Sequence, residues 1–150
     1  KRVAIYGGSY GGYTTLAGLA FTPDLYAAGV DYVGVSNLLS FLKAIPPYWK
    51  PYLEMLQEMV GHMEKDEAML KAASPVFHAD RIKTPTLFMG GEKDFNVPIA
   101  GGEQMYQALR SLGVETQLVV YPGVMITLTV LAFNSLGDVL RDLVDPRLSS

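Results

Sequence analysis

The chain has no cysteine, so disulfide bonds and thiolate chemistry can play no part in its fold or its function. This absence does not by itself choose a cellular compartment, and the cytoplasm serves as the working expectation. Long apolar runs are also missing, because no stretch approaches the ~20 residues of a membrane span. A membrane is therefore not an expected partner of this chain.

Runs of charge of one sign are absent as well. Twelve basic and fifteen acidic residues give a net charge of -3, and neither sign gathers in one place. Nucleic acid and anionic surfaces are recognised by basic clusters, so neither is an expected partner. With 49% hydrophobic residues, the 150-residue chain can bury the core of one domain. Because Lys1 is not a methionine and leads at once into a strand, we expect a preceding segment.

The most informative segment is a glycine-rich turn near the N-terminus. Residues 7–12 read GGSYGG; they follow an apolar, strand-like stretch and precede a helix-like one at 14–20. A strand, a sharp turn with a serine at its apex and a helix form the G-x-S-x-G nucleophile elbow of α/β-hydrolases. We expect Ser9 to adopt a strained backbone conformation, which the small neighbours Gly7 and Gly11 permit.

This turn supplies two chemical groups. The hydroxyl of Ser9 is the candidate nucleophile. The N–H of Tyr10 lies at a helix N-terminus, aimed where the oxyanion of an acyl-transfer intermediate forms. A glycine-rich phosphate loop or an ordinary turn is the alternative, and it is disfavoured because both flanking elements are of the type that the elbow requires.

The rest of the chain alternates between strand-like and helix-like segments. Further strands are predicted at 26–35, 84–90 and 115–121. Helices are predicted at 37–44, 53–60, 65–73 and 98–112, the last capped by Gly113, and the proline-aromatic stretch 45–52 is predicted to break regular structure. Strands separated by helices predict an α/β fold with a doubly wound, mostly parallel sheet and flanking helices.

A carboxylate follows the strand predicted at 84–90. The loop 90–98 places Asp94 at the carboxyl end of that strand, where open α/β sheets build their sites. A hydrolase triad needs a carboxylate there to orient a histidine ring, in the chain order Ser, Asp, His. We therefore assign Asp94 the role of triad acid, with a plain surface aspartate as the alternative.

Four segments stand out in combination: residues 7–13 (GGSYGGY), 73–82 (ASPVFHADRI), 90–98 (GGEKDFNVP) and 120–122 (VYP). Together they resemble the catalytic domain of the prolyl oligopeptidase family, near its acylaminoacyl-peptidase and dipeptidyl-peptidase branches. The resemblance covers residues 1–123 as the C-terminal part of an α/β-hydrolase peptidase domain, and it leaves 124–150 as a divergent tail.

The resemblance carries expectations about activity and partners. It implies a serine peptidase that hydrolyses peptide bonds of short peptides through an acyl-enzyme, without a metal or an organic cofactor. It also implies that an N-terminal β-propeller and upstream strands are missing from this chain, and it leaves a homo-oligomer open. Ser9 would be the nucleophile, Asp94 the orienting acid and the Tyr10 N–H one oxyanion donor; the second donor comes from a segment before the elbow.

The resemblance also suggests a specificity pocket. The residues that fall where such enzymes bind the side chain preceding the cut bond are Val35, Asn96 and Val97. Three aromatic residues are candidates to wall the same cleft: Tyr48, Trp49 and Tyr52. Simple packing is the alternative for Asn96 and, more strongly, for the aromatics.

The general base of the family is missing. In the family, Val-Tyr-Pro is followed within a few residues by Gly-His, whereas no histidine follows Asp94 here. His62 and His78 precede Asp94, against the hydrolase order; we expect His62 to be solvated and His78 to serve packing or hydrogen bonding. A serine hydroxyl without an adjacent base is a weak nucleophile, so the chain as given should be nearly inert.

A shifted reading frame offers an explanation for the missing histidine. If residues 123–126 were encoded GGG-GTC-ATG-ATH, reading from the last base of the glycine codon would give GGT-CAT-GAT, or Gly-His-Asp. We hypothesise a frameshift near Gly123, which would make residues 124–150 foreign to the family.

Two other functions remain open. An esterase or lipase on the same fold would use the same elbow, and a catalytically dead interaction domain would keep the fold without the base. Because the strand that leads into the elbow is normally central in its sheet, we expect this chain to be poorly soluble or partner-dependent.

Overall fold

The computed structural model describes residues 3–45, 47–94 and 97–122. Its strands are β1 (Ala4–Gly8), β2 (Ala28–Tyr32), β3 (Thr86–Gly91) and β4 (Thr116–Tyr121). Its helices are α1 (Tyr10–Phe21), α2 (Leu38–Ala44), α3 (Lys50–Val60), α4 (Glu67–Ala73) and α5 (Ala100–Ser111), with 3-10 turns η1 (Pro47–Trp49) and η2 (Pro75–Arg81). The predictions for Asn96 and for residues 124–150 lie outside the described residues.

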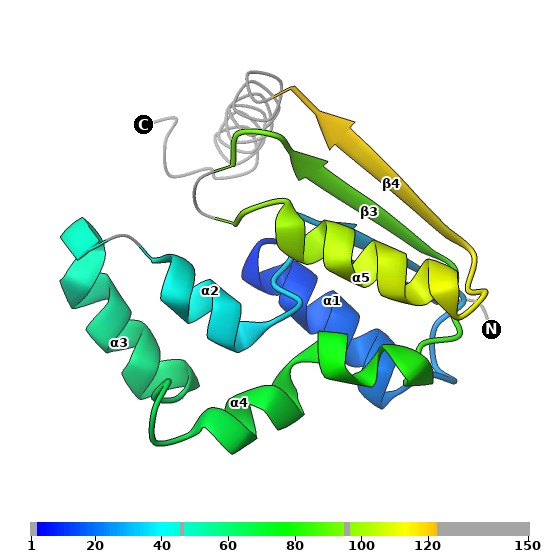
Figure 1. Cartoon of the computed structure of the whole chain (residues 1–150). Helices are drawn as coiled ribbons and strands as arrows, with labels where there is room; N and C mark the ends of the chain where they lie inside the picture. Colours follow the sequence, from blue (N-terminus) through cyan, green and yellow to red (C-terminus); the bar gives the residue numbers. More distant parts are fainter. Residues whose placement is uncertain (1–2, 46, 95–96, 123–150) are drawn as a thin grey trace, which may run out of the picture.

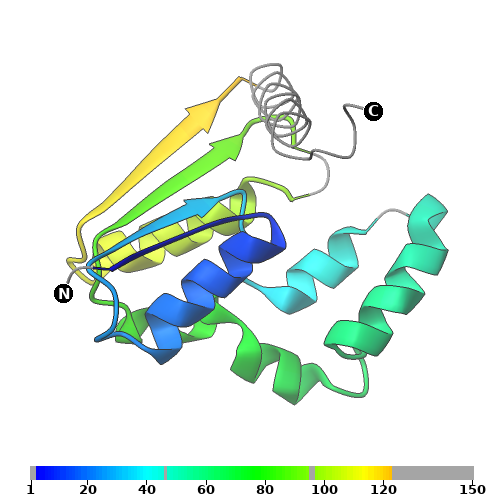
Figure 2. The same ribbon diagram turned by 180° about the vertical axis from the view of Figure 1, so that it is seen from behind.

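The four strands form one parallel sheet in the order β1-β2-β3-β4. In register, Gly8 pairs with Tyr32, Tyr32 with Met89 and Met89 with Val119. Because all strands run the same way, their carboxyl ends meet along one edge of the sheet, as Figures 1 and 2 show. The turn after β1 and the loop after β3 therefore lie on the same edge.

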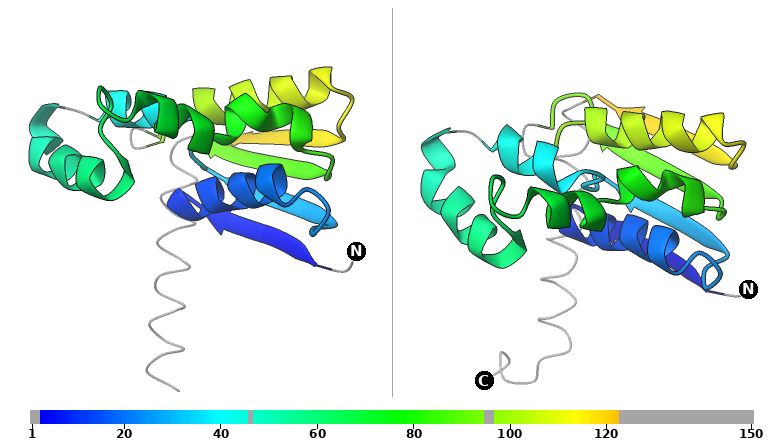
Figure 3. Two further views of the ribbon diagram at one scale, coloured as in Figure 1. Left: turned by 90° about the horizontal axis from the view of Figure 1, so that it is seen from below. Right: turned by 60° about the horizontal axis from the view of Figure 1, so that its bottom comes forward.

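Helices α1 and α5 cover one face of the sheet, and α2, α3 and α4 lie beside the sheet, beyond the ends of the strands (Figure 3). The main core lies between the strands and this helical layer, and its largest members are Leu16, Leu19, Ile82, Phe88, Met105 and Leu109. A second cluster joins α2, α3 and α4 through Leu38, Leu42, Leu56 and Leu70, and it includes Val35 and Val97. The predicted α/β class, with a parallel sheet and flanking helices, is confirmed.

The opposite face of the sheet carries no helix among the described residues (Figure 2). Tyr6 is 75% exposed there; its cross-strand partner Val30, and Leu87, which pairs with Val30 on β3, are only half-buried. Parallel sheets are normally covered on both faces, which is why their strands are apolar on both sides. The expected dependence on a partner for solubility thus has a physical basis, and it stays a prediction.

The structure corrects two predicted boundaries. Helix α3 starts at Lys50, inside the stretch 45–52 that was expected to break regular structure, because Pro51 lies in its first turn, where no intrahelical N–H bond is lost. Strand β2 is shorter than the predicted 26–35, because the chain turns away at Val33, whose φ is 47°. Gly113, with a φ of 76°, ends α5 as predicted.

Ser74 fixes the start of α2, which lines the cavity described below. Its fully buried hydroxyl accepts a hydrogen bond from the Leu38 N–H at 2.9 Å and donates one to the Leu70 carbonyl at 2.6 Å. We expect Ser74→Ala to lower the free energy of unfolding by about 1–3 kcal/mol, because the Leu38 N–H stays buried without a partner. Urea unfolding measures this difference.

The control for this prediction is Ser111→Ala. The Ser111 hydroxyl also donates to a backbone carbonyl, that of Ala108 at 2.7 Å, but on an exposed helix end. We expect Ser111→Ala to change the free energy of unfolding by less than about 0.5 kcal/mol. Equal losses in the two variants would contradict the assignment of Ser74 as a buried link.

Candidate active site

Ser9 occupies a strained turn between β1 and α1. Its φ of 55° and ψ of -119° lie in a region that residues with a side chain rarely adopt. The Ser9 N–H donates to the Tyr32 carbonyl at 2.9 Å, continuing the sheet, and the Ser9 carbonyl accepts from the Tyr13 N–H at 3.2 Å, starting the helix. The predicted strained conformation at Ser9 is confirmed, and its side chain is exposed.

Tyr10 is the first residue of α1. Its N–H therefore has no carbonyl acceptor within the helix, and the Ser9 side chain does not cap the helix either. Its ring contacts that of Tyr13 at 5.2 Å between centroids. The backbone N–H of Tyr10 thus lies beside the Ser9 hydroxyl at the positive end of the helix dipole, as expected of an oxyanion donor.

The glycines around the turn have different roles from those predicted. A Cβ atom on Gly7 would collide with the backbone carbonyl of Gly11, so Gly7 is required as predicted. A Cβ atom on Gly11 itself would meet nothing within 4 Å, so the predicted steric need for glycine there is wrong for the described residues. Gly12 is the second constrained position, because a Cβ there would collide with Asp31 and Gly34.

Asp94 follows β3 in a loop that its own side chain helps to shape. Its Oδ1 accepts a hydrogen bond from the Val97 N–H at 3.0 Å, and its N–H donates to the Gly91 carbonyl at 3.4 Å. Burial, and after it the negative charge of Asp94, raises the pKa of Tyr32 on the intervening strand. Ser9 and Asp94 thus follow β1 and β3, the strands on either side of β2, at the same edge of the sheet.

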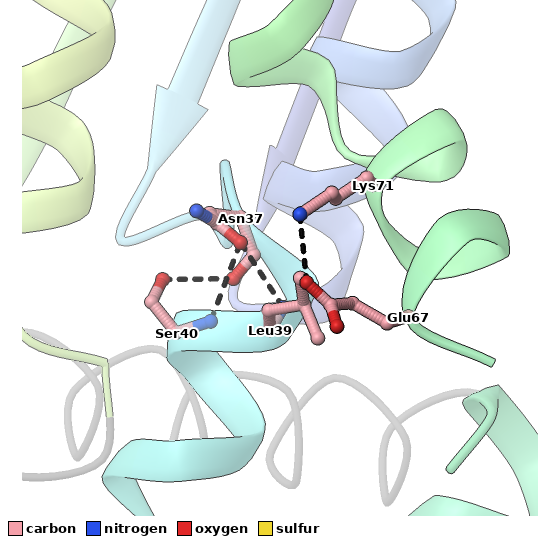
Figure 4. A network of polar contacts seen from close by, with 5 residues as sticks. All are labelled: Asn37, Leu39, Ser40, Glu67 and Lys71. Carbon is pink, nitrogen blue, oxygen red and sulfur yellow. Dashed lines mark hydrogen bonds and ion pairs between the residues drawn. The ribbon is translucent and has the colours of Figure 1, made fainter. Parts of the chain in front are cut away.

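A cavity of about 180 Å³ opens beside this edge, between α2 and the start of α5. Two of the predicted pocket residues, Val35 and Val97, line it together with Phe41 of α2. Asn37, which also lines it, caps α2 by accepting hydrogen bonds from the Leu39 and Ser40 N–H groups at 3.0 and 3.3 Å (Figure 4). Phe41 was not predicted for this pocket, although its place one helical turn after Asn37 could have indicated it.

The three aromatic candidates do not line this cavity. Tyr48, Trp49 and Tyr52 are exposed, and their rings contact one another edge to face rather than the cavity. Their assignment to a wall of the cleft is therefore wrong for this cavity. They are not core residues either, because η1 and the start of α3 lie at the periphery of the molecule (Figure 1).

Neither histidine lies beside Ser9. The His78 ring is 2.8 Å from the Ala72 carbonyl through Nε2 and contacts the ring of Phe21, the last residue of α1, so its predicted packing role is confirmed. That contact lies at the far end of α1 from Ser9, roughly 18 Å away along the helix. His62 lies half-buried in the connection between α3 and α4 rather than solvated as predicted, and its backbone N–H donates to the Asp66 Oδ2 at 2.8 Å.

The glycine contacts generate a test with a matched control. We expect Gly7→Ala to lower the free energy of unfolding by about 2 kcal/mol or more, because the new methyl group collides with backbone in the turn. Gly11→Ala should be neutral, or stabilising by about 0.5–1 kcal/mol, because alanine is the better helix former. Thermal or urea unfolding of both variants checks this, and a greater loss in Gly11→Ala would contradict it.

The comparison with known proteins agrees with this geometry. The profile of the prolyl oligopeptidase family matches residues 1–125. Dipeptidyl aminopeptidase BIII of Pseudoxanthomonas mexicana is 43% identical over 123 residues, covering 81% of this chain and 18% of that protein. The acylamino-acid-releasing enzyme of Arabidopsis thaliana is 33% identical over 126 residues, covering 81% and 16%. The chain spans less than a fifth of the length of these relatives.

Solved structures give the same result. A puromycin-hydrolyzing peptidase of Mycobacterium tuberculosis matches with a TM-score of 0.74 at 34% identity, over 81% of this chain and 18% of that one. An acylaminoacyl peptidase in complex with Z-Gly-Gly-Phe-chloromethyl ketone matches with a TM-score of 0.71 at 28% identity, over 80% and 19%. These relatives are serine peptidases on an α/β-hydrolase fold. The chain belongs to the prolyl oligopeptidase family.

Proposed function

We propose that this chain carries the nucleophile and the acid of a serine-peptidase active site that cleaves short peptides by acyl transfer. The observation that carries the proposal is the strained backbone of Ser9 at the junction of a parallel strand and a helix N-terminus. Such strain persists only where the surrounding structure enforces it, and it concentrates at functional sites. Asp94, two strands along the same edge, supplies the carboxylate.

The residues divide the acylation step between them. The Ser9 Oγ forms a bond to the peptide carbonyl carbon and gives its proton to a base, and the carbonyl oxygen becomes an oxyanion. The Tyr10 N–H donates a hydrogen bond to that oxyanion. When the intermediate collapses, the carbon–nitrogen bond breaks and the amine leaves with the proton. Asp94 does not touch the substrate; it orients the imidazole ring of the base that accepts the Ser9 proton.

The cavity lined by Val35, Phe41 and Val97 is the proposed pocket for the substrate side chain that precedes the cut bond. Its lining is mainly apolar, so an apolar side chain is the best match. The choice between an exopeptidase and an endopeptidase would depend on parts of the protein outside these residues. Asn96 stays a proposed member of the same pocket.

The absence of a histidine base is the observation that bears on the choice between a peptidase and a non-catalytic domain. No histidine follows Asp94 in the sequence, so we propose that this chain does not turn over on its own. The same observation favours a second candidate function, an interaction domain that keeps the fold without catalysis. The peptidase site and the interaction domain differ in one respect: only in the former can Ser9 react when a base is supplied.

Chemical rescue separates these two functions. We expect the chain to react slowly with a fluorophosphonate probe and to react roughly tenfold faster or more when free imidazole is added, because imidazole can replace the absent base. Mass spectrometry should locate the adduct on Ser9. Ser9→Ala should abolish the adduct, and Asp94→Asn should weaken the rescue because the ring loses its orienting carboxylate.

The matched control is Asp80→Asn, which removes an exposed carboxylate from η2, away from the sheet edge. It should leave the rescue unchanged. Labelling that imidazole does not accelerate, or that persists in Ser9→Ala, would contradict the proposed active site and favour the interaction domain.

A further inference from the structure

Asp31 is a buried acid that the proposed mechanism does not use. It lies in β2, paired in register with Gly7 of β1 and Phe88 of β3, and it points to the helical face of the sheet. Its side chain is 2% exposed, and its Oδ1 has no hydrogen-bond partner among the described residues. A buried polar atom without a partner is rare, because its desolvation is not compensated.

The carboxyl group of Asp31 is enclosed by two glycines. A Cβ atom on either Gly12 or Gly34 would collide with the Asp31 Oδ1. Gly12 lies in the first turn of α1, three residues after Ser9. Gly34 lies in the chain that leaves β2 and lines the cavity next to Val35. One side chain therefore contacts both the turn that holds the proposed nucleophile and the wall of the proposed substrate pocket.

Within the part of the chain that the structure describes, no charged group offsets the burial of Asp31. Strands β1 and β3 and helix α1 contain no Asp, Glu, Lys, Arg or His, and Glu103 and Arg110 of α5 are both exposed. The other titratable groups on β1, β2, β4, α1 and α5 are Tyr6, Tyr10, Tyr13, Tyr32, Tyr106 and Tyr121. Burial alone raises the pKa of Asp31 from its ordinary 3.8 to about 7.

A small cavity adjoins Asp31. Its volume is about 10 Å³, room for about one water molecule, and Gly34, Phe88 and Gly90 line it with Asp31. The neutral carboxyl group fits this enclosed place, whereas an ionised one needs more water than the cavity holds. Ionisation therefore favours a conformation in which the Gly34 segment moves away from the first turn of α1.

We propose that Asp31 is a positioning residue that joins the first turn of α1 to the wall of the substrate pocket, and that this junction opens as the carboxyl group ionises. In the packed form Asp31 is preferentially protonated, whereas in the opened form its carboxyl group has the pKa of an ordinary aspartate. The packed form is thus most stable at low pH and loses stability as the pH rises from about 4 to about 7. The inference rests on the proposed function only in that it takes Ser9, at the start of α1, as the nucleophile.

Amide NMR of the whole chain tests the inference. The amides of Tyr13 and Val33 flank the junction and donate to the Ser9 and Met89 carbonyls. We expect their exchange rates, corrected for the intrinsic effect of pH, to rise by up to about tenfold per pH unit from pH 5 to pH 7 and then to level off. In Asp31→Asn, which keeps the shape of the neutral acid, the corrected rates should not change with pH. Asp80→Asn should behave like the unaltered chain.

Two results would overturn the proposal: corrected rates that do not depend on pH in the unaltered chain, or a dependence that Asp31→Asn retains. If Asp31→Asn does not fold, the carboxyl carbon of Asp31 is titrated in the unaltered chain instead. A midpoint shared with the amide shifts of Gly12 and Gly34 supports the junction, and different midpoints refute it. Neither readout needs a substrate, a probe or a base, so a failed imidazole rescue leaves this test intact.

Discussion

The hydrogen bond from the Ser9 N–H to the Tyr32 carbonyl, together with the close approach of Gly7 to the Gly11 carbonyl, holds the chain in a turn that serine would not adopt alone. The last sheet contact of β1 and the first turn of α1 are separated by this single residue. The site depends on that constraint, because it places an exposed hydroxyl beside the N-terminus of a helix. The parallel sheet then brings Asp94 to the same edge.

The motif at residues 7–12 could be predicted from the sequence because its geometry depends on local residue types. Glycines between a strand-like and a helix-like stretch leave few alternatives, and the strained φ of Ser9 was expected for that reason. Asp94 was readable because a loop after a parallel strand has a known place in the fold. The family followed from several such segments in combination.

Other features depend on contacts between distant segments, and sequence reasoning missed them. The tight position is Gly12 rather than Gly11, because Asp31 and Gly34 pack against Gly12 from another strand and loop. The aromatic residues 48–52 were placed in the cleft, yet they lie at the periphery, because their orientation depends on where α3 starts. No pattern in the sequence singles out Asp31, since its burial depends on the packing of α1 against β2.

The proposed function depends on two assignments: Ser9 is the nucleophile, and the cavity lined by Val35 and Val97 receives the substrate side chain. A crystal structure of the chain soaked with a peptide boronic acid tests both parts, because boron forms a tetrahedral adduct with a serine hydroxyl. The account predicts a bond from boron to the Ser9 Oγ, a hydrogen bond from the Tyr10 N–H to a boronate oxygen and the peptide side chain between Val35 and Val97. Boron bound elsewhere, or a side chain outside that cavity, would contradict it.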